Sequence, residues 1–144
     1  MSIKQISVFL ENKPGTLKAM TNVLAANKVN LRALSVAETK DFGIARMVAD
    51  DVLHAVNVLR EASFVANLTP VLAVAVPDEA GGLDKLLSIF SEAEVNIEYM
   101  YAFLGGKNTN HAYMIFRVAD SKEAEARLTQ KGLKLLTQED VEEI

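Results

Sequence analysis

The chain has 144 residues, which is enough for one ordinary domain or two very small ones, and half of its residues are apolar. Its formal net charge of −4, with no cluster of basic residues, argues against nucleic acid and anionic membrane surfaces as partners. The absence of cysteine excludes disulfides, thiolate metal sites and a cysteine nucleophile, and it fits a cytoplasmic location.

The first half of the chain shows strand and helix patterns in alternation. Apolar periodicity predicts a strand over residues 3–10, followed by a helix whose apolar face is Leu17, Met20, Val23 and Leu24, and then a strand from Val29. Turn residues over 39–43 lead into a predicted strand over 44–49. A helix capped by Asp50 or Asp51 and a weak strand over 64–68 follow. This is a β-α-β-β-α-β order.

The second half shows the same order again. The patterns predict a strand over residues 71–76, a helix striped by Leu83, Leu86, Leu87 and Phe90, a strand from Val95, a turn-rich segment over 105–110, a strand over 112–118, a helix that Asp120 or Ser121 caps, and a weak strand over 133–136. Thr137 to Asp140 resembles a capping box that opens a short final helix. The run of apolar residues from 71 to 76 is far too short to cross a bilayer, and the first residues do not resemble a signal peptide.

The two halves are related as an internal repeat. Residues 11–17 align with residues 77–83 at a shift of 66, and Val29-Asn30-Leu31 aligns with Val95-Asn96-Ile97 at the same shift. We therefore expect two domains, residues 1–69 and 70–144. Right-handed crossovers convert each β-α-β-β-α-β repeat into an α+β, ferredoxin-like unit, a four-stranded antiparallel sheet with both helices on one face.

The feature with the clearest chemical meaning is the turn between the first strand and first helix of each repeat. In the first repeat, Pro14 stiffens the turn and Gly15 allows close approach of a ligand or a neighbouring backbone. The helix that follows offers unpaired N–H groups and a partial positive charge to a carboxylate. Asn12 can donate and accept hydrogen bonds, whereas Asp78 can hold only a donor or a cation. A ligand with both an ammonium and a carboxylate group would use the whole turn; a plain tight turn is the alternative.

Known catalytic and metal-binding patterns are absent from the sequence. It has no Gly-x-Ser-x-Gly elbow, no phosphate loop and no His-Glu-x-x-His, so we expect no catalytic residue, no metal and no cofactor. His54 and His111 are expected to be structural. Tyr99, Tyr101 and Phe103 alternate in phase with Ile97 along a predicted strand, which favours core packing over a ligand-stacking surface.

These repeats resemble ACT domains, the βαββαβ regulatory modules of amino-acid metabolism, as a tandem pair over essentially the whole chain. The resemblance lies in Asn12-Lys13-Pro14-Gly15-Thr16-Leu17 with Val29-Asn30-Leu31, and in Asp78-Glu79-Ala80-Gly81-Gly82-Leu83 with Val95-Asn96-Ile97. The second copy departs from the pattern, with Ala80 in place of proline and Asp78 in place of asparagine.

The resemblance implies a non-catalytic sensor that binds a free L-amino acid at an interface between two ACT domains. The glycine turn of one domain and the asparagine at the start of the second strand of the other would supply the contacts. The implied ligand-binding residues are Asn12, Lys13, Pro14, Gly15, Thr16, Asn30, Leu31, Asp78, Glu79, Ala80, Gly81, Gly82, Asn96 and Ile97. The partner of such a sensor would be an enzyme or a transporter.

The expected strand directions favour a site shared between domains. The first and second strands of a repeat are parallel, so Asn12 and Asn30 lie at opposite ends of one sheet and cannot meet on one ligand. A neighbour docked antiparallel along the second strand would bring Asn12 to Asn96 and Asp78 to Asn30, and edge pairing would satisfy exposed strand groups. Little more than Thr69-Pro70 joins the repeats, which is too short for a side-by-side pair within one chain. Either the strand over 64–68 is irregular or the partner domain comes from a second chain, and we favour a homodimer. The alternatives are an enzyme of acylphosphatase type, although residues 12–17 hold no arginine for a phosphate loop, and a ligand-free interaction module.

Overall fold

A computed structural model describes residues 2–38, 40–105 and 110–144 of the chain. The predicted turns over 39–43 and 105–110 include residues 39 and 106–109, which lie outside the described residues. The chain divides into two compact units. The first unit is Lys4–Thr69, and the second unit is Pro70–Ile144 together with Met1–Ile3.

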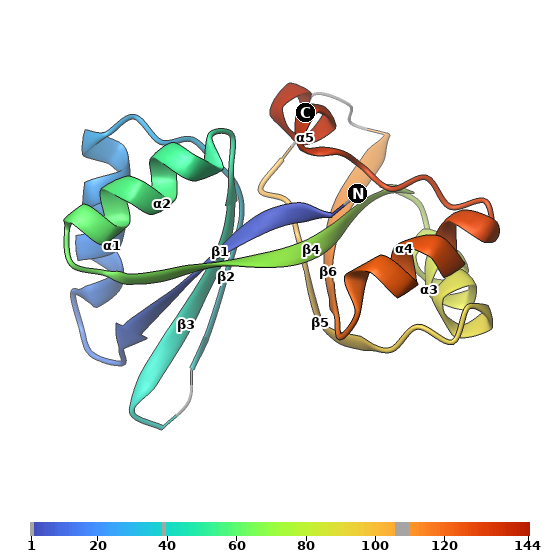
Figure 1. Cartoon of the computed structure of the whole chain (residues 1–144), viewed down its shortest axis with the longest axis horizontal. Helices are drawn as coiled ribbons and strands as arrows, with labels where there is room; N and C mark the ends of the chain where they lie inside the picture. Colours follow the sequence, from blue (N-terminus) through green and yellow to red (C-terminus); the bar gives the residue numbers. More distant parts are fainter. Residues whose placement is uncertain (1, 39, 106–109) are drawn as a thin grey trace. The chain divides into compact units, whose positions relative to one another are not determined.

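The first unit has the expected β-α-β-β-α-β order (Figure 1). Its elements are β1 (Ile3–Glu11), α1 (Thr16–Ala26), β2 (Leu31–Glu38), β3 (Phe42–Ala49), α2 (Val52–Glu61) and the first part of β4 (Val65–Pro77). The strand order is β2-β3-β1-β4, and β3 is antiparallel to both β1 and β2. The expected break at Thr69-Pro70 lies inside β4, which continues into the second unit.

The core of the first unit lies between the sheet and its two helices. Ile6, Val8 and Leu10 alternate along β1 and are buried, as the period of two requires. They share one buried cluster with Met20 of α1 and Leu59 of α2. Both helices therefore cover the same face of the sheet (Figure 1).

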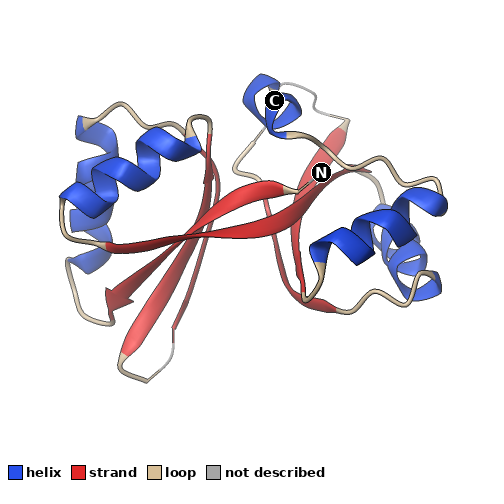
Figure 2. Ribbon diagram, viewed as in Figure 1, coloured by secondary structure: helices blue, strands red, loops and turns tan. Residues whose placement is uncertain are grey.

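The second unit repeats this plan with a different ending (Figure 2). Its elements after β4 are α3 (Gly82–Glu92), β5 (Ile97–Ala102), β6 (His111–Val118), α4 (Ser121–Gln130) and α5 (Gln138–Glu143). The strand order is β4-β6-β5, with both neighbouring pairs antiparallel. Phe90 of α3 and Phe116 of β6 pack with ring centroids 4.7 Å apart in the buried cluster under the helices.

The α+β fold of two ferredoxin-like repeats is confirmed, and the end of the second repeat differs from the expectation. Residues 133–136 form no strand, although the Leu136 N–H donates to Ala73 O at 2.8 Å. The predicted capping box is present: Thr137 accepts from the Asp140 N–H, and the Asp140 carboxylate accepts from the Thr137 N–H. It opens α5, which carries the fully buried Val141.

The expected phase of the aromatic residues along β5 is wrong. A register irregularity lies between Ile97 and Tyr99, with Glu98 as the extra residue. Ile97 packs against the core under the helices, but Tyr99 and Tyr101 are paired with Arg117 and Ile115, on the other face from Met100 and Phe116. An extra residue reverses every later side chain because the strand period is two.

No helix among the described residues is long and apolar enough to span a membrane.

Candidate functional site

The turn between β1 and α1 is held by its own backbone and by Thr16. Gly15 has φ of 89° and begins α1 without a side-chain cap, so a left-handed conformation is required there. The Thr16 hydroxyl donates to Glu11 O at 2.8 Å and to Lys13 O at 3.1 Å. Thr16 therefore closes the turn, while the exposed Asn12, Lys13 and Pro14 form its outer surface.

A hollow of about 380 Å³ lies beside this first turn. It is lined by Leu10, Glu11, Asn12, Lys13, Thr16, Leu17, Val36, Glu38 and Gly43. The Asn12 amide donates to Glu38 Oε2 at 2.7 Å, and Lys13 Nζ lies 2.9 Å from Glu11 Oε2. Amide, ammonium and carboxylate groups thus surround a small space next to a helix N-terminus, where the first N–H groups have no carbonyl of their own helix to bind.

The turn between β4 and α3 has the same backbone shape with different side chains. Gly81 has φ of 85° and begins α3 as Gly15 begins α1. The exposed Asp78 stands where the first turn has Asn12, and its N–H donates to Asn110 O at 2.9 Å. The exposed Glu79 and Ala80 complete the outer surface of this turn.

Gly82, one of the expected ligand-binding residues, is buried in the turn. A Cβ at this position would lie 2.3 Å from Pro77 O. The Gly82 N–H also donates to Glu79 O at 3.0 Å. Gly82 therefore lets the start of α3 pack against the end of β4, and the structure explains this glycine without a ligand.

Asn30, just before β2, belongs to a polar network centred on the Asp50 carboxylate. Its amide donates to Asp50 Oδ2 at 3.0 Å, and the Asp50 N–H donates to Asn30 O at 3.2 Å. The Arg32 guanidinium binds the same carboxylate through Nε to Oδ1 and through Nη2 to Oδ2. Burial raises the pKa of Asp50, but the hydrogen bonds from Arg32 and Asn30 and the charge of Arg32 outweigh it and hold that pKa below its usual value.

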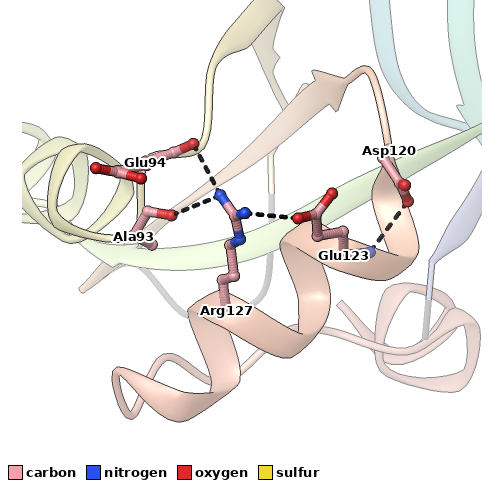
Figure 3. Close-up of polar contacts among 5 residues, drawn as sticks. All are labelled: Ala93, Glu94, Asp120, Glu123 and Arg127. Atoms are coloured by element: carbon pink, nitrogen blue, oxygen red, sulfur yellow. Dashed lines mark hydrogen bonds and ion pairs between the residues drawn. The ribbon is translucent and has the colours of Figure 1, made fainter.

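Asn96, the matching residue of the second unit, lies in different surroundings. It lines a hollow of about 210 Å³ together with Glu94, Val95, Val118, Ala119, Asp120, Glu123, Ala124 and Arg127. Asp120 accepts the Glu123 N–H at 3.1 Å as the N-cap of α4, and Arg127 pairs with the Glu123 carboxylate at 2.5 Å (Figure 3).

Arg127 also holds the end of α3. Its Nη1 lies 3.4 Å from both Ala93 O and Glu94 O, two carbonyls that follow the last residue of the helix (Figure 3). In the first unit His54 has the corresponding place, since its Nε2 lies 3.0 Å from Asn27 O at the end of α1. A basic side chain on the second helix thus satisfies the end of the first helix in each unit, which gives His54 the structural role that we expected.

The remaining expected residues, Leu31 and Ile97, are half-buried and pack against the cores of their units, so their side chains serve the fold. Sequence reasoning missed Arg32, Glu38 and Arg127. The sequence predicts Asp50 or Asp51 as the cap of α2, and Asp51 has that role by accepting the His54 N–H at 3.0 Å. No repeated motif marks Asp50, because Ala119 takes its place in the second unit, one residue before the N-cap Asp120.

Within the first unit, Asn12 and Asn30 lie at opposite ends of the sheet, as we inferred. Because β3 is antiparallel to both neighbours, β1 and β2 are parallel. Asn12 follows Glu11, which pairs with Phe42 at one end of β3, whereas Asn30 precedes Leu31, which pairs with Ala49 at the other end. One unit therefore cannot bring both asparagines to one small ligand. Among the described residues, no group of three or more histidine and acidic side chains gathers as metal ligands.

Comparison with known proteins places these features in a family. The family model described as "ACT domain pair" matches residues 1–144. A comparison with proteins of curated function returned no match.

Solved structures show the same fold. Protein BT0572 from Bacteroides thetaiotaomicron is 38% identical and superposes with a TM-score of 0.89, covering 100% of this chain and 98% of its own. The regulatory subunit of aspartate kinase from Thermus thermophilus, in its ligand-free form, is 16% identical with a TM-score of 0.65, and the match covers 90% of each chain.

Proposed function

The chain belongs to the ACT domain pair family, and from this premise we propose that it is a non-catalytic protein that binds a free L-amino acid and regulates an enzyme or a transporter. A regulatory, small-molecule-binding role is the property of the family; the amino acid as ligand and the residues that bind it are our proposal. No specific observation favours the two alternative functions, an acylphosphatase-type enzyme and a ligand-free interaction module.

The observation that carries the proposal is that the same turn conformation, with a left-handed glycine before a helix, occurs in both units. Gly15 and Gly81, with φ of 89° and 85°, each place a polar turn directly before a helix N-terminus. N–H groups in the first turn of a helix favour a carboxylate. The Asn12 amide oxygen or the Asp78 carboxylate can then accept from the ammonium group of the same ligand. The hollow beside Asn12 supplies the space.

The proposed site is shared between two ACT domains, because Asn12 and Asn30 lie at opposite ends of one sheet. We propose that Asn12 meets Asn96, and that Asp78 meets Asn30, on separate ligands. A second copy of the chain supplies the partner domain, so the functional form is a homodimer. The edge strands β2 and β5 carry unpaired backbone groups on which such a neighbour can dock. The cytoplasmic location expected from the sequence is part of this proposal.

A thermal-shift panel of the twenty standard L-amino acids tests the function. A ligand present at about one hundred times its dissociation constant stabilises the folded state by about 2.7 kcal/mol, which raises the melting temperature by several degrees. The double variant Asn12→Ala, Asp78→Ala should lose the shift. His54→Ala is the matched control, because it removes a polar side chain far from both turns in sequence and should keep the shift.

The absence of a thermal shift would reject the proposal. If no standard amino acid at millimolar concentration moves the melting temperature of the wild-type chain, the proposal is wrong, and a protein-interaction module becomes the better description. A shift that survives in the double variant would keep the function and reject these two residues as its site.

A further inference from the structure

The carboxylate of Asp50 determines which way the Asn30 amide faces. A carboxylate accepts hydrogen bonds and donates none, and the Asn30 Nδ2 atom lies 3.0 Å from Asp50 Oδ2. The side-chain nitrogen of Asn30 must therefore face Asp50, and its carbonyl oxygen Oδ1 is left for another donor. Asn30 is exposed, so a ligand can reach that oxygen.

Arg32 fixes the carboxylate in turn. Its guanidinium binds both oxygens of Asp50, a two-point contact that restrains the carboxylate in its plane as well as in its position. Arg32 can reach Asp50 because it is the extra residue at an irregularity of β2, between Leu31 and Ala33. The side chain of Arg32 is only 19% exposed, which limits competition by water.

We propose that Asp50 and Arg32 are positioning residues that hold the Asn30 amide with its acceptor oxygen outward, so that the site containing Asn30 selects ligands by their ammonium group. This inference deepens the proposed function and rests on it. Selection follows because an acceptor oxygen can bind an ammonium but repels a carboxylate, and a free amide could rotate to suit either.

The second unit lacks this arrangement at the matching place. The extra residue of β5 is Glu98, whose carboxylate lies 4.0 Å from Arg117 Nε. Asp120 caps α4 through the Glu123 N–H, as Asp51 caps α2, and the residue in the place of Asp50 is Ala119. Among the described residues, the Asn96 side chain makes no hydrogen bond, so its amide can present either end to a ligand. The two sites of the chain should therefore differ in selectivity.

The test compares each amino acid with the carboxylic acid that lacks its amino group, such as alanine with propionate. Calorimetry measures both affinities on the full chain carrying Asn96→Ala, which removes the amide of the other site. In this background we expect Asp50→Ala to lower the ratio of the two affinities by about tenfold, since an oriented acceptor for a charged donor is lost. Arg32→Gln keeps Asp50 and should lower the ratio by a smaller factor.

Asp51→Ala is the matched control. Asp51 is the next residue and caps α2 through the His54 N–H, whereas the Asn30 amide bonds Asp50. Its loss should lower the melting temperature and leave the affinity ratio unchanged. An unchanged ratio in both Asp50→Ala and Arg32→Gln, with wild-type binding intact, would overturn the positioning role alone. Absence of amino-acid binding in the wild-type chain would overturn this inference together with the proposed function.

Discussion

Arg32 and Glu98 occupy the same position in the two repeats, each as the extra residue of an irregular second strand, and they carry opposite charges. Arg32 turns to Asp50 and draws that carboxylate to Asn30. Glu98 instead faces Arg117, and the second unit has Ala119 in the place of Asp50. Two differences at matched positions, Arg32 against Glu98 and Asp50 against Ala119, thus account for the different surroundings of the two asparagines.

Acid should weaken the first unit through Asp50. Its pKa in the folded protein is below that of an unfolded aspartate, about 3.9. The unfolded state therefore binds the proton more readily, so the stabilisation is present above about pH 4 and is lost as the pH falls through the folded value. We expect Asp50→Asn to be less stable than wild type at neutral pH, with the difference shrinking below about pH 4.

Urea unfolding of both proteins from pH 7 to pH 2.5 measures this difference. The pKa of Asp140 is also lowered, chiefly by the hydrogen bond from the Thr137 backbone, but Asp140 is present in both proteins and cancels in the comparison. A stability difference that stays constant over the whole range would show that Asp50 does not titrate as described.

Replacing the glycines of the two turns should lower the free energy of unfolding by different amounts. Gly15→Ala and Gly81→Ala force a left-handed conformation on alanine, at about 1–2 kcal/mol of unfolding free energy each. Gly82→Ala should cost more than either, because its Cβ would lie 2.3 Å from a backbone oxygen. Gly105, with open space around its Cβ position and no left-handed φ, is the control and should change stability by less than about 0.5 kcal/mol. Chemical denaturation ranks the four variants; Gly82→Ala as mild as Gly105→Ala would contradict the packing argument.

The two turns should give two classes of ligand site. Asn12 and Asp78 stand at equivalent positions and differ by one negative charge. Asp78→Asn should weaken ammonium binding at one class, through loss of a charge-assisted hydrogen bond, and spare the other. Calorimetric titration with the amino acid that stabilises the wild type resolves the classes. Equal loss at both would mean that the sites are coupled or that Asp78 is wrongly assigned.

The chain should sediment as a homodimer at micromolar concentration. Each unit has an open edge strand, β2 or β5, and pairing would satisfy exposed backbone groups while completing the shared site. Sedimentation equilibrium gives the mass directly. A species of 15.7 kDa would argue against a site built from two chains and would leave the fold untouched.

The final helix should depend on its capping box. Thr137→Ala removes the acceptor for the Asp140 N–H and should cost about 1 kcal/mol, since α5 holds the buried Val141 in place. Thr129→Ala, at an exposed position inside α4, is the control for loss of a threonine hydroxyl. Thermal melts of the two variants compare them; equal melting temperatures would mean that the cap contributes nothing to stability.

The sequence alone determined the duplication, the element order and the polar turns before α1 and α3. These features are local or periodic: Gly15 and Gly81 mark the turns, apolar spacing marks the helices, and Thr137 with Asp140 marks the last cap. Opposite placement of Asn12 and Asn30 could also be derived, because right-handed crossovers make β1 and β2 parallel.

The tertiary structure alone decided what depends on neighbouring strands and on packing. The extra residues Arg32 and Glu98 have no local signature, since a strand becomes irregular only against a partner. The extra residue Glu98 reversed the face of Tyr99, and the extra residue Arg32 reaches the Asp50 carboxylate. Two further features depend on which backbone lies alongside: the close approach of Gly82 to Pro77, and the absence of a strand over residues 133–136. No pattern within a single segment of the sequence predicts that neighbouring backbone.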